Sequence, residues 1–140
     1  MQISNFQDLL DAATLQCAVQ RLLLVFAGAT LPKGASAQQR AEFEAGHGGE
    51  LDPLMCVDKL PQELSSFSAL ADEADQLMRA NQQYWQIVFV ASLSGSSGLP
   101  PSPEQAEKAL TAMVDAIRGG RIDGFIPFNR QGAAVNLQAG

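Results

Sequence analysis

Residues that usually build catalytic and metal sites are scarce in this sequence. Its 140 residues include one histidine, His47, and two cysteines, Cys17 and Cys56, which do not form a CxxC pair. A histidine-based triad, a zinc site and a disulfide framework each require more of these residues or a different spacing. The sequence therefore predicts no catalytic residue, no metal site and no bound cofactor.

Positive charge and long apolar runs are also scarce. Nine Lys and Arg residues stand against fifteen Asp and Glu residues, so the formal net charge is −6. Proteins that bind nucleic-acid backbones need a basic surplus on one face, and no nucleic-acid partner is expected. The longest apolar stretch, LLLVFA, is too short for a membrane span, and MQISNFQDLLDAA lacks the cationic start of a signal peptide. We therefore expect a cytoplasmic protein that does not enter the membrane.

The overall composition is that of an ordinary globular domain. Apolar residues make up 46% of the chain and charged residues 17%, which is typical of folded rather than disordered proteins. A chain of this length can bury a core of its own. We therefore predict a single domain over residues 1–140.

The two halves of the chain resemble each other. Four pairs of segments match in the same order, first copy before second: ISNFQDLLDAA and LSSFSALADEA, LVF and IVF, SAQQ and SPEQ, GELDPLMCVD and GRIDGFIPFN. The offset grows from 61 residues for the first pair (64 minus 3) to 71 for the last (120 minus 49), as it would if the second copy had longer loops. The sequence thus predicts an internal duplication with pseudo-repeats 1–60 and 61–130.

Each copy is expected to fold as helix, strand, helix, strand. Apolar residues at helical spacing favour the first helix, and an S-x-x-Q capping box starts the second helix at Ser36 and at Ser102. LLLVFA and IVFVA are continuously apolar, which is typical of central strands with both faces covered. PLMCV and FIPF are shorter, and Pro127 has no N–H to donate to a neighbouring strand, so both belong at the sheet edges.

These elements predict an α/β fold with one four-stranded, mainly parallel sheet of order 2-1-3-4, covered by helices. The parallel direction is expected because a strand–helix–strand unit normally makes a right-handed parallel crossover. Whether the two copies join with their central strands parallel or antiparallel stays open. The tail RQGAAVNLQAG either turns at Gln131 and Gly132 to add a short antiparallel strand, or frays.

Ligands of open α/β sheets bind at the carboxyl ends of the central strands. The loops expected there, 28–36 and 92–102, are rich in Gly and small hydroxyls, and they lead into helix N-termini that favour anions. The candidate ligand-binding residues in them are Gly28, Thr30, Lys33, Ser94, Gly95 and Gly98. Neither loop contains GxxxxGK[ST] or GxGxxG, so the sequence favours plain connectors over a phosphate site.

Two equivalent polar pairs end the flanking strands. Asp58 and Lys59 follow one strand, and Asn129 and Arg130 follow the other. They are further candidates for a polar ligand site. Solvated strand ends and turn residues are the favoured interpretation, because exposed ion pairs are common and contribute little.

The segments VFAGATLP, PLMCVDK, VFVASLSG and FIPFNRQG resemble a family of small proteobacterial proteins that often bear the name ribonucleotide reductase subunit alpha. The similarity covers nearly the whole chain and implies a bacterial protein. The family name implies reduction of ribonucleotides, which requires a large barrel domain and several cysteines. With Cys17 and Cys56 alone, this chain is not expected to catalyse that reaction, and the resemblance assigns no site residue.

Two functions are consistent with the sequence. The favoured one is a non-catalytic module that binds a protein partner or associates with itself as a homodimer. The alternative is a protein, with or without enzyme activity, that binds a small molecule or phosphate through the loops at 28–36 and 92–102.

Overall fold

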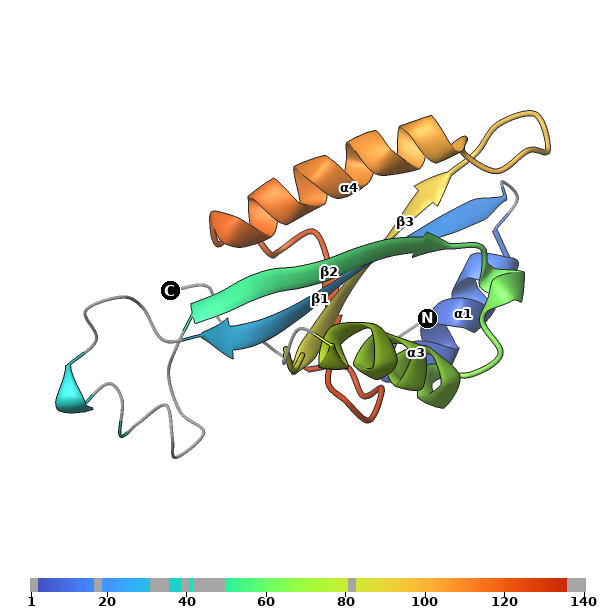
Figure 1. The fold of residues 1–140 in the computed structure, drawn as a ribbon. Coiled ribbons are helices and arrows are strands. Elements are labelled where there is room, and N and C mark those ends of the chain that lie inside the picture. Colours follow the sequence, from blue (N-terminus) through green and yellow to red (C-terminus); the bar gives the residue numbers. More distant parts are fainter. Residues whose placement is uncertain are drawn as a thin grey trace.

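The computed structural model describes residues 3–16, 19–30, 36–38, 41, 50–80 and 83–135. In chain order its elements are α1 (Phe6–Thr14), β1 (Gln20–Thr30), β2 (Glu50–Lys59), the short 3-10 helix η1 (Pro61–Glu63), α3 (Phe67–Arg79), β3 (Ile87–Ser94), α4 (Pro103–Arg118) and β4 (Ile126–Phe128) (Figure 1). The helix expected to begin near Ser36 lies largely outside the described residues. The internal duplication therefore stays a prediction.

The four strands form one sheet in the order β2-β1-β3-β4, as predicted. Every neighbouring pair in this sheet is antiparallel, so the prediction of a mainly parallel sheet is wrong. The edge position of β4 agrees with the argument from Pro127, which pairs with Phe89.

The error has a physical cause. A continuous apolar run indicates that both faces of a strand are covered. A strand can be covered on both faces whether it runs parallel or antiparallel to its neighbours. The crossover rule also assumes that the connection brings the chain back to the end of the sheet where the first strand began, so that the second strand runs parallel to it. Here Glu50 pairs with Thr30 at the end of β1, and Ile126 pairs with Val90 in the middle of β3. Both connections thus deliver the chain to a position from which it runs antiparallel.

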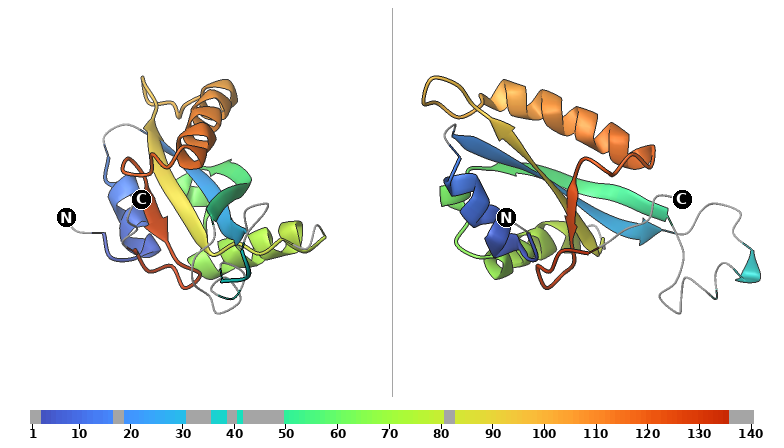
Figure 2. Two further views of the ribbon diagram at one scale, coloured as in Figure 1. Left: turned by 90° about the vertical axis from the view of Figure 1, so that its left-hand side faces the viewer. Right: turned by 180° about the vertical axis from the view of Figure 1, so that it is seen from behind.

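Helices cover the sheet on both faces, with α1 and α3 on one side and α4 on the other (Figure 2). Alternate residues of β1 supply the two cores: Leu22, Leu24 and Phe26 face α1 and α3, whereas Leu23, Val25 and Ala27 face α4. Rings from α1, α3 and β4 meet beneath the first face, since the Phe6 centroid lies 5.2 Å from that of Phe67 and 5.5 Å from that of Phe128.

Helix α4 begins where the sequence predicts. Ser102 accepts a hydrogen bond from the N–H of Gln105, and the Gln105 side chain accepts one from the N–H of Ser102, which completes the capping box. The helix buries a stripe at helical spacing, namely Ala106, Leu110, Met113 and Ile117. None of the described helices is long and apolar enough to cross a membrane.

The C-terminal segment turns back at Gly132, whose φ of 81° favours glycine. The residues after this turn form isolated antiparallel bridges from Ala133 to Asn5 and from Ala134 to Phe128. The tail up to residue 135 is thereby attached to α1 and β4, without forming a strand of its own.

Replacing Leu24 with alanine should lower the free energy of unfolding by about 2–5 kcal/mol, since the side chain is fully buried in the centre of β1. Urea denaturation measures the loss. Leu77→Ala on α3 is the matched control, because Leu77 is 55% exposed and its truncation should change stability by no more than about 0.5 kcal/mol. Equal losses for the two variants would contradict this core.

Candidate functional site

The described parts of the two candidate loops do not lie together, since the end of β1 and the end of β3 are at opposite ends of the sheet. In the antiparallel pairing of β1 with β3, Gln20 is opposite Ser94 and Ala27 is opposite Ile87. Gly28 and Thr30 at the end of β1 therefore lie beside the start of β3, far from the loop that follows Ser94. The shared crevice expected from a parallel sheet does not form. Lys33 lies outside the described residues.

The glycines in these loops have visible structural roles. A Cβ on Gly28 would lie 2.5 Å from the carbonyl oxygen of Tyr84, so glycine permits the close approach of the segment before β3. After β3 the chain makes a tight turn in which Leu99 N–H donates to Ser96 O at 3.0 Å. Ser97 and Gly98 have φ values of 54° and 77° within this turn, as a type I′ turn requires.

Gly95 closes the base of the same turn. Its N–H donates to the carbonyl oxygen of Val19 at 2.8 Å, and a Cβ in its place would overlap the carbonyl oxygen of Leu99. The start of α4 that follows is already capped by Ser102. The loop at 92–102 thus has the contacts of a connector.

Asp58 and Lys59 make separate ion pairs on the two sides of β2. Arg21 donates from Nη1 to Asp58 at 2.6 Å and from Nε to the carbonyl oxygen of Pro101 at 3.0 Å. Lys59 donates to Glu73 of α3 at 3.2 Å. These contacts connect the end of β2 to its neighbours, and they lie at the opposite end of the sheet from Asn129 and Arg130.

Asn129 and Arg130 contact the turn after β4 and the segment before β3. The Oδ1 atom of Asn129 accepts from the N–H groups of Gln131 at 2.9 Å and Ala133 at 3.0 Å, which is a turn role. Arg130 donates to both carboxylate oxygens of Asp75, at 3.1 and 2.7 Å, and to the carbonyl oxygen of Trp85 at 3.2 Å. Its guanidinium carbon also lies 4.6 Å from the centre of the Trp85 ring.

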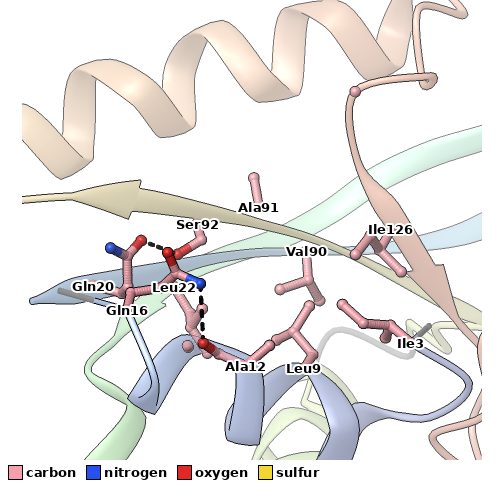
Figure 3. Close-up of a pocket in the computed structure, with 12 residues that line it drawn as sticks. Ile3, Leu9, Ala12, Gln16, Gln20, Leu22, Val90, Ala91, Ser92 and Ile126 are labelled. Carbon is pink, nitrogen blue, oxygen red and sulfur yellow. Dashed lines mark hydrogen bonds between the residues drawn. The ribbon is translucent and has the colours of Figure 1, made fainter. Parts of the chain in front are cut away.

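The structure reveals a groove that the sequence did not indicate. It has a volume of about 370 Å³ and lies between α1 and the face of β1 and β3 (Figure 3). Its apolar part includes Leu9, Leu22 and Val90, with Ile3 and Ile126 at one end. Gln16, Gln20 and Ser92 lie at the other end, where Ser92 Oγ donates to Gln20 Oε1 at 2.6 Å.

The groove runs along a strand edge that is open in the part of the chain that the structure describes. β3 pairs with β1 over all of its eight residues but with β4 only at Val88, Phe89 and Val90. Beyond them, from Ala91 to Ser94, no described strand pairs with the outer edge of β3. Figure 2 shows β3 extending past β4 toward the turn that leads to α4.

The backbone groups on this edge point outward at alternate residues. Pro127 opposite Phe89 has no N–H, so the ladder bonds between β3 and β4 fall at Val88 and Val90. Backbone direction repeats every two residues, so the N–H and C=O groups of Ser92 and Ser94 point the same way. The bond from Gly95 N–H to Val19, toward β1, agrees with this alternation.

A second hollow lies on the other face of the same strand end. It has a volume of about 470 Å³ and is lined by Leu93 and Ser94 of β3, Pro101, and Gln105, Lys108 and Ala109 of α4. The open edge is thus flanked by one hollow on each face of the sheet. The strand lengths could have suggested it, because FIPF is much shorter than IVFVASLS, but only the register shows which end is left uncovered.

Amide hydrogen exchange should separate the open edge from its neighbours. The N–H groups of Ser92 and Ser94 should exchange at least about tenfold faster than those of Val88 and Val90, which bond to β4; tenfold corresponds to 1.4 kcal/mol of opening free energy. The N–H of Leu93, which faces β1, is the control within the same strand and should exchange slowly. Slow exchange at Ser92, measured by NMR, would show that its edge is covered.

Asp75 should make stability depend on pH. Hydrogen bonding from Arg130 lowers the pKa of this carboxyl below its ordinary value of 3.8, against the opposing effect of burial. A pKa that is lower in the folded state stabilises the protein above the unfolded pKa, and this contribution is lost as pH falls through the folded value. The stability difference between wild type and Asp75→Asn should therefore be largest near neutral pH and shrink below pH 3.8.

Thermal unfolding at a series of pH values measures this difference. Gln76→Asn, an exposed substitution on the same helix that removes no ionisable group, is the control, and its difference from wild type should not vary with pH. A constant difference for Asp75→Asn across the pH range would contradict the role of the Arg130 pair.

Within the described residues, no group of three or more His, Cys, Asp or Glu side chains could hold a metal ion. Comparison of the chain with protein-family models, with curated proteins and with solved structures yields no match. The resemblance to the proteins named ribonucleotide reductase subunit alpha therefore stays a prediction.

Proposed function

We propose that this protein is a non-catalytic interaction module that binds an extended segment of a partner protein as an added strand on the outer edge of β3. The observation that carries the proposal is the open edge from Ala91 to Ser94, with a hollow on each face. Strand addition combines main-chain hydrogen bonds with pockets for alternate side chains of the incoming segment. The segment from Ala91 to Ser94 offers both an open main-chain edge and adjacent hollows.

The polarity of the strand changes where the added segment would lie. Val88 and Val90 are buried beneath the helices, whereas Ser92 and Ser94, on the same face two and four residues later, are exposed. Leu15 and Leu99 at the neighbouring chain turns are 72% and 67% exposed. Apolar side chains of a partner could contact these leucines while its backbone bonds to the serines.

The other edge of the sheet is less suited to strand addition. β2 contains Pro53, and its register with β1 shifts next to this residue, between Phe26 and Ala27. Its last residues are the charged Asp58 and Lys59. Proline, bulges and charges are the features that protect edge strands from pairing, and β3 has none of them between Ala91 and Ser94.

The energies favour a partner that also fills a hollow. Four main-chain hydrogen bonds contribute roughly 2–6 kcal/mol, at about 0.5–1.5 kcal/mol each. Association itself costs about 4–15 kcal/mol, so these bonds do not suffice. One buried Leu or Phe side chain adds about 1.5–3 kcal/mol. We therefore expect a weak, reversible complex in which the groove beneath α1 accepts an apolar side chain.

A second copy of this chain is the other occupant that the edge admits, which gives a homodimer joined at β3. A common phosphate or small-molecule site in the loops 28–36 and 92–102 is not proposed, because the antiparallel sheet separates these loops. The cytoplasmic location expected from the sequence remains part of the proposal.

The substitution Ser92→Pro should weaken peptide binding at least about tenfold, because it removes the outward N–H of Ser92 and places a ring at the edge. The probes are synthetic peptides selected from a random display library on the immobilised protein, and fluorescence polarisation measures their affinity. Ser92→Ala is the matched control. It loses the same hydroxyl, keeps the N–H and should bind nearly as well as wild type.

Two results would decide against the proposal. One is equal affinity of the selected peptides for wild type and Ser92→Pro, with both proteins shown to be folded by thermal unfolding. The other is failure of N-methylation at any backbone position to weaken a selected peptide. A dimer that sedimentation detects in wild type and not in Ser92→Pro would assign the edge to self-association.

A further inference from the structure

A separate hollow of about 430 Å³ lies at the other end of β3. It is lined by the last turns of α3, by the segment before β3 and by Arg130. Tyr84 is 75% exposed at its rim, and Gln83 and Gln86 are the neutral polar residues beside it. Its position at the start of β3 separates it from the open edge, which is at the end of that strand.

The charges in this hollow do not balance. Among the described residues that line it, Arg130 and Arg79 carry two positive charges and Asp75 carries the one negative charge. Arg79 follows Asp75 by one helical turn and helps to lower the pKa of its carboxyl. Arg130 donates from both Nη1 and Nη2 to Asp75. Two positive charges and one negative charge leave the described lining of the hollow with a net charge of +1, in a chain whose formal net charge is −6.

Arg130 also retains donors for a further ligand. A guanidinium has five N–H groups. Within the described residues, Nη1 uses two of them, on Asp75 and on Trp85, and Nη2 uses one, on Asp75. The Nε–H and the second N–H of Nη2 lie side by side on the remaining edge of the plane. Such a fork matches the two oxygens of a carboxylate.

The position of Arg130 is set by its neighbours rather than by the ligand. Its plane lies over the Trp85 ring, and the indole N–H of Trp85 donates to the same Asp75 oxygen, Oδ1, at 3.0 Å. Asp75 thereby connects both side chains. An arginine held in this way loses little conformational freedom when it binds a ligand.

We propose that this hollow binds an acidic side chain of a partner protein, with its carboxylate between Arg130 and Arg79 and its neighbouring apolar residue against the ring of Tyr84. One carboxylate neutralises the net charge of +1, whereas a phosphate dianion would leave excess negative charge beside Asp75. The exposed Tyr84, Arg79 and Arg130 are also of the residue types that contribute most at protein interfaces. The site does not depend on strand addition at β3.

NMR titration with two blocked peptides tests the proposal. Ac-Phe-Glu-Leu-NH₂ should shift the indole N–H signal of Trp85 and the Nε–H signal of Arg130. Ac-Phe-Gln-Leu-NH₂ has the same shape without the charge and should bind at least about tenfold more weakly, since hydrogen bonds to charged groups are the stronger ones.

Substitutions of the lining residues test whether the Glu peptide binds in this hollow. Arg79→Ala and Tyr84→Ala should each weaken the Glu peptide at least about fivefold without unfolding the protein, because both side chains are exposed. Arg79→Lys should restore part of the loss, since it keeps the charge. Arg118→Ala, which removes the equivalent arginine from the last turn of α4, is the matched control and should leave the affinity unchanged.

Equal binding of the Glu and Gln peptides, or no shift at Trp85 with either, would overturn the proposal. Displacement of the Glu peptide by inorganic phosphate at lower concentration than by acetate would overturn the choice of a carboxylate. Ser92→Pro should leave this titration unchanged, so failure here and failure of strand addition at β3 can be distinguished.

Discussion

The antiparallel pairing of β1 with β3 is the contact on which the rest of the structure depends. Eight residue pairs, from Gln20 with Ser94 to Ala27 with Ile87, join the two longest apolar strands along the middle of the sheet. This register places Leu24 opposite Val90, and it gives each face of the sheet a continuous apolar surface for helices to cover. It also determines which loops share an end of the molecule. A parallel pairing of the same strands would have produced a different site.

The open edge follows from unequal strand lengths around that centre. β1 supports the whole of β3, so the strand stays extended where β4, with only three residues, no longer accompanies it. Ser92 and Ser94 replace the valines of the same face at that point. Both hydroxyls bond to Gln20, and Ser92 and Gln20 form a polar end to an otherwise apolar groove. The fold thereby holds in place a strand edge that no described strand pairs with, which a flexible loop could not do.

Several features could be predicted from particular residues. The Ser102 capping box, the buried stripe of α4, the edge position of the strand with Pro127 and the strand order 2-1-3-4 all depend on local pattern or on the missing N–H of proline. The candidate site was harder to predict from the sequence. Arg130 was identified from its place after a strand, but its partners Asp75 and Trp85 are 55 and 45 residues away in the chain. No spacing rule connects such residues.

The sequence by itself determined where most helices and strands lie and which strands are central, because these properties follow from hydrophobic periodicity and from the backbone chemistry of proline and capping residues. Only the tertiary structure decided the strand directions, the register and hence which end of β3 the described strands leave open. The physical reason is that an apolar strand covered on both faces is equally stable in either direction as far as its own residues show. The strand direction is determined by the end of the sheet at which each connecting segment finishes, and by contacts between residues that are far apart in the chain.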